Sequence, residues 1–163
     1  MVLMGVTGSG KSSVGEALAP LVGARYFDGD NLHPPANIAK MSRGEPLTDE
    51  DRWPWLAKVG QTLASADDMV IVGCSALKRA YRDRIRDVAG DAVVFIHLAG
   101  SQSVIAARLH ERRGHFMPPA LLASQFASLE PPGPDERAIE VDIDQSFDAV
   151  IAEIAGKLER AQA

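Results

Sequence analysis

The stretch Gly5-Val6-Thr7-Gly8-Ser9-Gly10-Lys11-Ser12 decides the fold, because it fits the pattern G-x-x-x-x-G-K-[ST] at every fixed position. Glycines in such a loop allow close backbone approach and positive φ angles, so that successive N–H groups point at a polyphosphate. An apolar run precedes the loop and a helical pattern follows it, which adds the positive end of a helix dipole. An ordinary Gly/Ser turn is the alternative, but the complete pattern in this context predicts a site for a Mg²⁺–nucleoside triphosphate.

Two residues of this loop have distinct predicted roles. Lys11 is expected to bridge the β- and γ-phosphates of ATP and is therefore a predicted catalytic residue, whereas the hydroxyl of Ser12 is expected to hold Mg²⁺. The other predicted ATP contacts belong to the loop or to the start of the helix after it: Gly5, Val6, Thr7, Gly8, Ser9, Gly10 and Ser13.

Strands and helices alternate along the chain outward from this loop. Short apolar runs rich in β-branched or aromatic residues predict five strands, at Val2–Val6, Arg25–Asp28, Met69–Cys74, Val93–Ala99 and Ile139–Ile143. Helical spacing is found at Lys11–Val22, Glu50–Ala66, Lys78–Val88, Ser101–Arg113 and Ser146–Arg160. The alternation predicts a three-layer α/β fold, in which a central parallel five-stranded sheet carries helices on both faces.

Two segments do not fit this alternation. Asn31–Asp49 and Gly114–Pro134 are rich in Pro, Gly and polar residues, and both are long for connections in a compact domain. Long irregular connections often serve as lids or binding loops, so we expect functional loops in both places.

Composition bounds the class of protein. The chain has 163 residues, which predicts a single domain over residues 1–163, and 46% hydrophobic with 24% charged residues excludes a disordered or fibrous chain. The net charge of −5 gives no support for a nucleic-acid partner. A single cysteine, which allows no intrachain disulfide, and the lack of an apolar run near the roughly 20 residues that span a bilayer predict a cytoplasmic protein without a membrane partner. No Cys/His cluster has the spacing of zinc ligands, so a structural metal is not expected.

Polar side chains follow the second predicted strand, in the sequence Asp28-Gly29-Asp30. Ligands of a parallel α/β sheet lie beyond the carboxyl ends of its strands, so these carboxylates are expected near the phosphate loop. One of them could face the metal and the other an incoming hydroxyl, although a solvated Asp-Gly turn is the alternative. Further on, His33 and Lys40 offer hydrogen bonds, and Arg52 offers a fork that matches a carboxylate.

Two arginines predict a lid. Arg108 and Arg112 are four residues apart, on one helix face, just before Gly114. Arginines on a mobile segment can neutralise the charge that spreads over a transferring γ-phosphate, so both are predicted ATP contacts and Arg112 a catalytic residue. We expect the lid over about residues 108–130, where it would exclude water, while an ordinary charged helix end is the alternative.

Several segments together resemble the gluconokinase family. Beside the phosphate loop, these are DGDNLHPPANIAKMSRGEPLTDEDRWPWL, CSALKRAYRD at Cys74–Asp83, RLHERRGHF at Arg108–Phe116, and the shorter runs Gln125-Phe126, Leu129-Glu130-Pro131 and Val141-Asp142-Ile143-Asp144. The likeness extends from Met1 to about Leu158. Gluconokinases are small phosphate-loop kinases, related to shikimate kinase, that use ATP to phosphorylate the 6-hydroxyl of D-gluconate.

The resemblance implies roles for the acceptor-side residues. Asp30 would contact the accepting hydroxyl as a catalytic residue, and Asp28 would lie in the outer shell of the metal. Arg52 and either Lys78 or Arg82 would hold the substrate carboxylate, although most of the basic run that these last two belong to is expected to be a solvated helix face. His33, Lys40 and His115 complete the predicted substrate contacts. The resemblance also implies a homodimer.

Two other functions stay open. The chain could be a different small-metabolite kinase, acting on shikimate or a related sugar acid. It could also be a nucleotide-dependent regulatory module, although such a switch needs no second set of polar residues like Asp28, Asp30 and Arg52.

Overall fold

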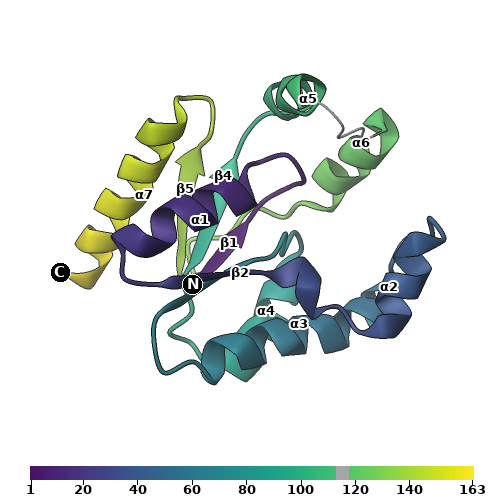
Figure 1. Ribbon diagram of the computed structural model, residues 1–163, viewed down its shortest axis with the longest axis horizontal. Coiled ribbons are helices and arrows are strands. Elements are labelled where there is room, and N and C mark those ends of the chain that lie inside the picture. Colours follow the sequence, from purple (N-terminus) through teal and green to yellow (C-terminus); the bar gives the residue numbers. More distant parts are fainter. Residues whose placement is uncertain (113–117) are drawn as a thin grey trace.

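A parallel five-stranded sheet forms the centre of the computed structural model, which describes residues 1–112 and 118–163. Its strands are β1 (Val2–Met4), β2 (Arg25–Asp28), β3 (Val70–Gly73), β4 (Phe95–Ala99) and β5 (Ala138–Asp142), in the order β2-β3-β1-β4-β5 (Figure 1). All of the strand pairs are parallel. The predicted α/β class and the predicted sheet are therefore confirmed, with strand bounds that differ by at most two residues.

Two apolar cores lie on opposite faces of the sheet. Side chains alternate along a strand, so Leu3 of β1 packs in one core while Val2 and Met4 pack in the other. Helices α1 (Lys11–Leu21) and α7 (Phe147–Gln162) cover the first face, and α3 (Asp49–Ala64) and α4 (Arg79–Ala89) cover the second (Figure 1). The three layers follow from this burial on both faces.

The two segments expected to be irregular contain helices, so that prediction was wrong. Residues 29–32 form a short 3₁₀ helix, α2 spans Pro35–Ser42, and α6 spans Pro119–Ser128 after α5 (Gln102–Glu111). Both α2 and α6 begin at the second residue of a Pro-Pro pair. Proline at the first helical position needs no N–H partner and already has a helical φ, so these prolines start helices.

The strand order brings chemically active loops to one edge of the sheet. β1 lies between β3 and β4, and the chain leaves it for α1 through the phosphate loop, while the segments after β2 and β3 emerge at the same carboxyl edge. Ligands of open α/β sheets bind at such an edge. Among the described residues, no helix is both long and apolar enough to cross a membrane.

Candidate active site

The phosphate loop forms an anion cradle. Gly5, Gly8 and Gly10 have φ angles of 145°, 87° and 96°, which only glycine adopts at low cost. Gly10 is also the N-cap of α1, and no side chain caps the first N–H groups of that helix. These groups and the helix dipole are thus available to an anion, as the sequence pattern predicted.

Lys11 lies at the base of this cradle. Its ammonium donates hydrogen bonds to the carbonyl oxygens of Gly5 and Val6, at 2.8 and 3.0 Å. Desolvation lowers the pKa of Lys11, and the nearby negative charges of Asp30 and Asp28 act against this shift. The thiol of Cys74 is buried beside the same lysine, and burial raises its pKa to about 12, so it is a neutral neighbour.

The two carboxylates after β2 differ in their environment. Asp28 accepts a hydrogen bond from the backbone N–H of Asp30 at 2.9 Å and so caps the 3₁₀ helix. Desolvation and then the charge of Asp28 raise the pKa of Asp30, while Lys11 partly offsets the increase. Asp30 is therefore more basic than an ordinary aspartate, and the residue is exposed. These properties suit a general base.

Trp55 and Asn37 hold the acceptor side in place. The buried indole of Trp55 donates to the carbonyl oxygen of Gly29 at 2.8 Å and stacks on His33 with ring centroids 4.0 Å apart. The buried amide nitrogen of Asn37 donates to the carbonyl of Asp51 at 2.9 Å and lies 3.2 Å from Nδ1 of His33. Nδ1 is therefore an acceptor, and the neutral ring carries its proton on Nε2. Burial, which lowers the pKa of His33, favours this neutral form.

A pair of cations lies between α3 and α4. Lys78 Nζ is 3.3 Å from both carboxylate oxygens of Asp49, and Arg52 Nη1 is 4.0 Å from one of them. Both cations lie 5.5 Å from the ring centroid of Tyr81, whose hydroxyl also donates to Asp49. Sequence reasoning found the two cations but missed Asp49 and Tyr81, because only tertiary contact reveals their role.

Lys40 is placed differently. Its ammonium pairs with Asp51 at 2.6 Å, and Asp51 also closes the capping box of α3 with Thr48. The lysine thus has a partner that anchors α2 to α3, which leaves its predicted substrate contact without support from the structure.

The predicted ATP-contacting arginines line a cavity of about 450 Å³ beside the phosphate loop. Arg108 donates a hydrogen bond to the carbonyl oxygen of Ile143, and Arg112 follows the end of α5. The ring of Phe147 also lines the cavity and is 47% exposed, which makes it a candidate to stack on a nucleobase. The sequence analysis did not identify Phe147 as a candidate contact. His115 lies outside the described residues.

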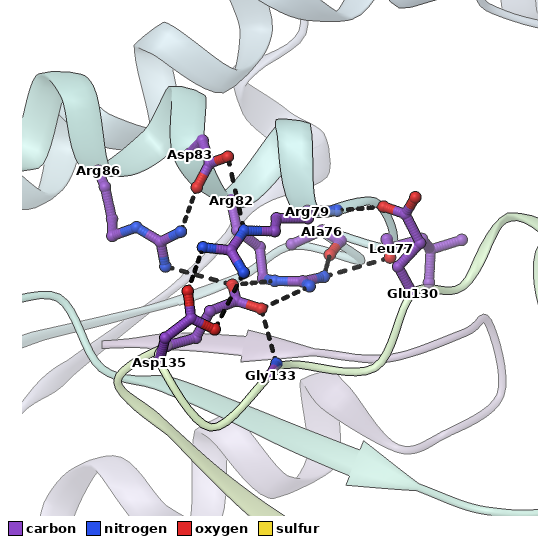
Figure 2. A network of polar contacts seen from close by, with 10 residues as sticks. Ala76, Leu77, Arg79, Arg82, Asp83, Arg86, Glu130, Gly133 and Asp135 are labelled. Carbon is purple, nitrogen blue, oxygen red and sulfur yellow. Dashed lines mark hydrogen bonds and ion pairs between the residues drawn. The ribbon is translucent and has the colours of Figure 1, made fainter.

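Arg82 is the clear disagreement with the sequence analysis. Its guanidinium is 0% exposed and forms two hydrogen bonds to Glu136, at 2.8 and 3.0 Å. It also donates to the carbonyl oxygens of Ala76 and Leu77 (Figure 2). A buried arginine with these partners is not available to a substrate carboxylate, and it is not part of a solvated face, so Lys78 is the alternative that the structure favours.

Glu136→Gln is expected to lower the free energy of unfolding at neutral pH by about 3–5 kcal/mol, because it leaves the charge of Arg82 buried without its counter-ion. Hydrogen bonds from Arg82 lower the pKa of Glu136 from 4.5 to about 2. Because the folded-state pKa is the lower one, the stabilisation is present above pH 4.5 and is lost as the pH falls toward 2. The difference between wild type and variant in denaturant unfolding should shrink over that range. Asp135→Asn, which removes an exposed partner of Arg79, is the control and should cost less than about 1 kcal/mol.

The donor set fits a magnesium–nucleotide complex. The hydroxyl of Ser12 is exposed at the first turn of α1, and the carboxylate of Asp28 ends the strand β2. Hydroxyl and carboxylate oxygens are the hard ligands that Mg²⁺ prefers. No cluster of His, Cys, Asp or Glu among the described residues offers a separate metal centre.

The glycine cradle, its lysine and the carboxylates beyond β2 define a phosphate-loop kinase. The family model described as "Shikimate kinase" matches residues 7–125. A shikimate kinase structure from Bacteroides thetaiotaomicron is 16% identical with a TM-score of 0.67, covering 97% of each chain, which shows the shared fold.

Closer relatives narrow this class. The gluconokinase of Gluconobacter oxydans is 46% identical over 94% of this chain and 88% of its own. The crystal structure of a gluconokinase from Sinorhizobium meliloti is 49% identical with a TM-score of 0.86, over 99% of this chain and 96% of that one. The chain belongs to the gluconokinase family, within the shikimate-kinase-like group.

Proposed function

We propose that this enzyme transfers the γ-phosphoryl group of ATP to the 6-hydroxyl of D-gluconate, giving 6-phospho-D-gluconate and ADP. One observation carries the proposal: the exposed carboxylate of Asp30 is near enough to the phosphate-loop lysine for their charges to interact, at the sheet edge where the nearby α3 and α4 present the cations Arg52 and Lys78. Asp30 supplies a base for an alcohol, and the two cations supply a counter-charge for a carboxylate. A polyhydroxy acid has an alcohol at one end and a carboxylate at the other, so it needs both.

Each residue then has a chemical task. Asp30 holds the hydroxyl in line with the phosphorus and accepts its proton as the new bond forms. Lys11 neutralises the charge of the transferring group, and Arg108 and Arg112, which line the cavity beside the loop, add further positive charge. Ser12 and Asp28 would hold Mg²⁺, which when bound neutralises the phosphate oxygens. The Nε2–H of His33 is a donor for a hydroxyl of the sugar chain, and the Arg52–Lys78 pair exchanges Asp49 for the substrate carboxylate.

A panel assay tests this function. ADP formation is measured with D-gluconate, other sugar acids, the corresponding neutral sugars and shikimate, each against a blank without acceptor. We expect turnover that depends on the acceptor and is fastest with gluconate. Equal rates across the sugar acids would refute gluconate as the specific substrate. ADP formation at the same rate with and without an acceptor would indicate a nucleotide switch. The Mg²⁺ requirement, a cytoplasmic location and a homodimer stay predictions.

Arg52→Met is expected to raise the KM for gluconate by about tenfold or more with a smaller change in kcat. The variant keeps the aliphatic bulk between α3 and Tyr81 but removes the charge that would meet the substrate carboxylate, a contact made before and during transfer. Steady-state kinetics against gluconate and against a neutral analogue give the measurement. Arg43→Met, which removes an exposed arginine paired with Glu45, is the matched control and should change neither constant. A fall in kcat alone would contradict the assignment.

A further inference from the structure

A side chain of α6 contacts the tip of the phosphate loop. The amide oxygen of Gln125 accepts a hydrogen bond from the backbone N–H of Thr7 at 2.8 Å, and its amide nitrogen donates to the Thr7 hydroxyl at 3.0 Å. Both ends of one amide are therefore used on one residue, which fixes the orientation of each partner. Thr7 directly precedes Gly8, whose φ of 87° turns the loop, so the contact acts where the loop bends toward the phosphate site.

The same tip is supported by α5. A Cβ atom added at Gly8 would lie only 2.8 Å from Cγ of Leu109, so the helix packs directly on the loop backbone. The apolar contact with Leu109 does not depend on orientation, whereas the hydrogen bonds of the Gln125 amide do. Gln125 is thus the group that can set the orientation of the tip.

The chain after Gln125 runs directly to the acceptor side. We call the segment Gln125–Glu136 the strap. The backbone N–H of Glu130 donates to the carbonyl of Leu77 at 2.8 Å, and its carboxylate accepts from the N–H of Arg79 at 2.6 Å. These two contacts bracket Lys78, the N-cap of α4 and one of the two candidate cations for the substrate carboxylate.

The end of the strap is firmly anchored. Figure 2 shows Glu130, Gly133 and Asp135 of the strap facing α4 and the loop before it. Arg79 pairs with Asp135, and the buried Arg82 pairs with Glu136 while it also holds the carbonyl oxygens of Ala76 and Leu77. The loop that ends at Lys78 is therefore fastened to the strap on several sides. Ala76 within it has a φ of 44°, a conformation that such fixed contacts can maintain.

We propose that Gln125 is a positioning residue for phosphoryl transfer, which through the strap sets the phosphate loop relative to the loop that carries Lys78. Glu130 is five positions after Gln125, and that length of chain spans at most about 18 Å even when extended. With both ends bonded, the two halves of the site keep a fixed spacing between the γ-phosphate and the accepting hydroxyl. The inference rests on the proposed function, because Lys78 matters only if an acidic acceptor binds there.

Kinetics of Gln125→Leu test the contact with Thr7. The leucine keeps the bulk but forms neither hydrogen bond, so we expect kcat to fall about tenfold, with the KM values for ATP and gluconate within about twofold of wild type. Thr7→Val removes the hydroxyl acceptor and should lower kcat in the same way, and the double variant should lose no more than the worse single one. Ser124→Ala, an exposed neighbour on α6, is the control and should match wild type. An unchanged kcat for Gln125→Leu, or a loss confined to the KM for ATP, would overturn the proposal.

A second cycle tests the strap. Glu130→Ala removes the side-chain hydrogen bond to α4 but leaves Gln125 in place. If the two residues acted independently, their fold-losses in kcat would multiply in the double variant Gln125→Leu/Glu130→Ala. We expect the double variant to lose no more than about the larger single loss, because both changes weaken the same connection between the phosphate loop and the loop that carries Lys78. Losses that multiply would overturn this part. The wild-type rate with gluconate tests the proposed function separately, and every variant is compared with wild type on whichever acid proves the best acceptor. Melting temperatures establish that each variant is folded.

Discussion

Asp30→Asn is expected to bind ATP, to fold normally and to lose at least about a hundredfold in kcat, the lower end of a typical acid–base contribution. Asparagine keeps the size and much of the hydrogen bonding of the side chain but removes the oxygen that would accept the proton of the alcohol. Because desolvation raises the pKa of Asp30, the kcat of the wild type should also fall at low pH, as this carboxylate becomes protonated. Steady-state turnover across pH measures both effects, and the acidic limb should be absent in the variant.

Asp28→Asn provides the matched comparison for this prediction. The carboxylate of Asp28 already accepts a hydrogen bond from the backbone N–H of Asp30, and its proposed place is in the outer shell of the metal. We therefore expect this variant to need more Mg²⁺ for the same rate, while Asp30→Asn keeps the response of the wild type. If Asp30→Asn retained most of its turnover and Asp28→Asn lost it at every Mg²⁺ concentration, the roles of the two carboxylates would be reversed.

Lys11→Ala is expected to lower kcat by about a thousandfold or more, because one preorganised charge at the transferring group contributes 10²–10³-fold or more in related sites. The circular dichroism spectrum should match that of the wild type, since Lys11 lies outside both apolar cores. The charge of Lys11 also lowers the pKa of Asp30, so its loss should raise that pKa and move the acidic limb of the remaining activity to higher pH.

Lys58→Ala, on an exposed position of α3, is the control for the loss of one lysine and should leave kcat unchanged. Nearly full activity of Lys11→Ala, or a fold change by circular dichroism, would contradict the placement of Lys11. An acidic limb that does not move would argue that Asp30 and Lys11 are not coupled.

Much of the fold follows from local sequence. The phosphate loop needs glycines at fixed positions because its φ angles are positive, and this requirement can be read directly from the chain. The continuous apolar runs at β1, β3 and β4 predict strands that are covered on both faces, as they are. The sequence also predicts much of the chemistry of the site, because the side chains of Lys11, Asp30 and Arg52 suit a phosphate, an alcohol and a carboxylate respectively.

Other features depended on tertiary structure. The segments that contain α2 and α6 were expected to be irregular because they are long and rich in Pro, Gly and polar residues, but the second proline of a Pro-Pro pair begins a helix in each. Local sequence does not show which of the four arginines of α4 faces inward; Arg82 does because Glu136, 54 residues away, provides its charge partner. Likewise, the contact between Gln125 and Thr7 joins residues 118 positions apart. Composition and periodicity determine which elements form, whereas the partners of polar side chains are decided only when distant segments pack together.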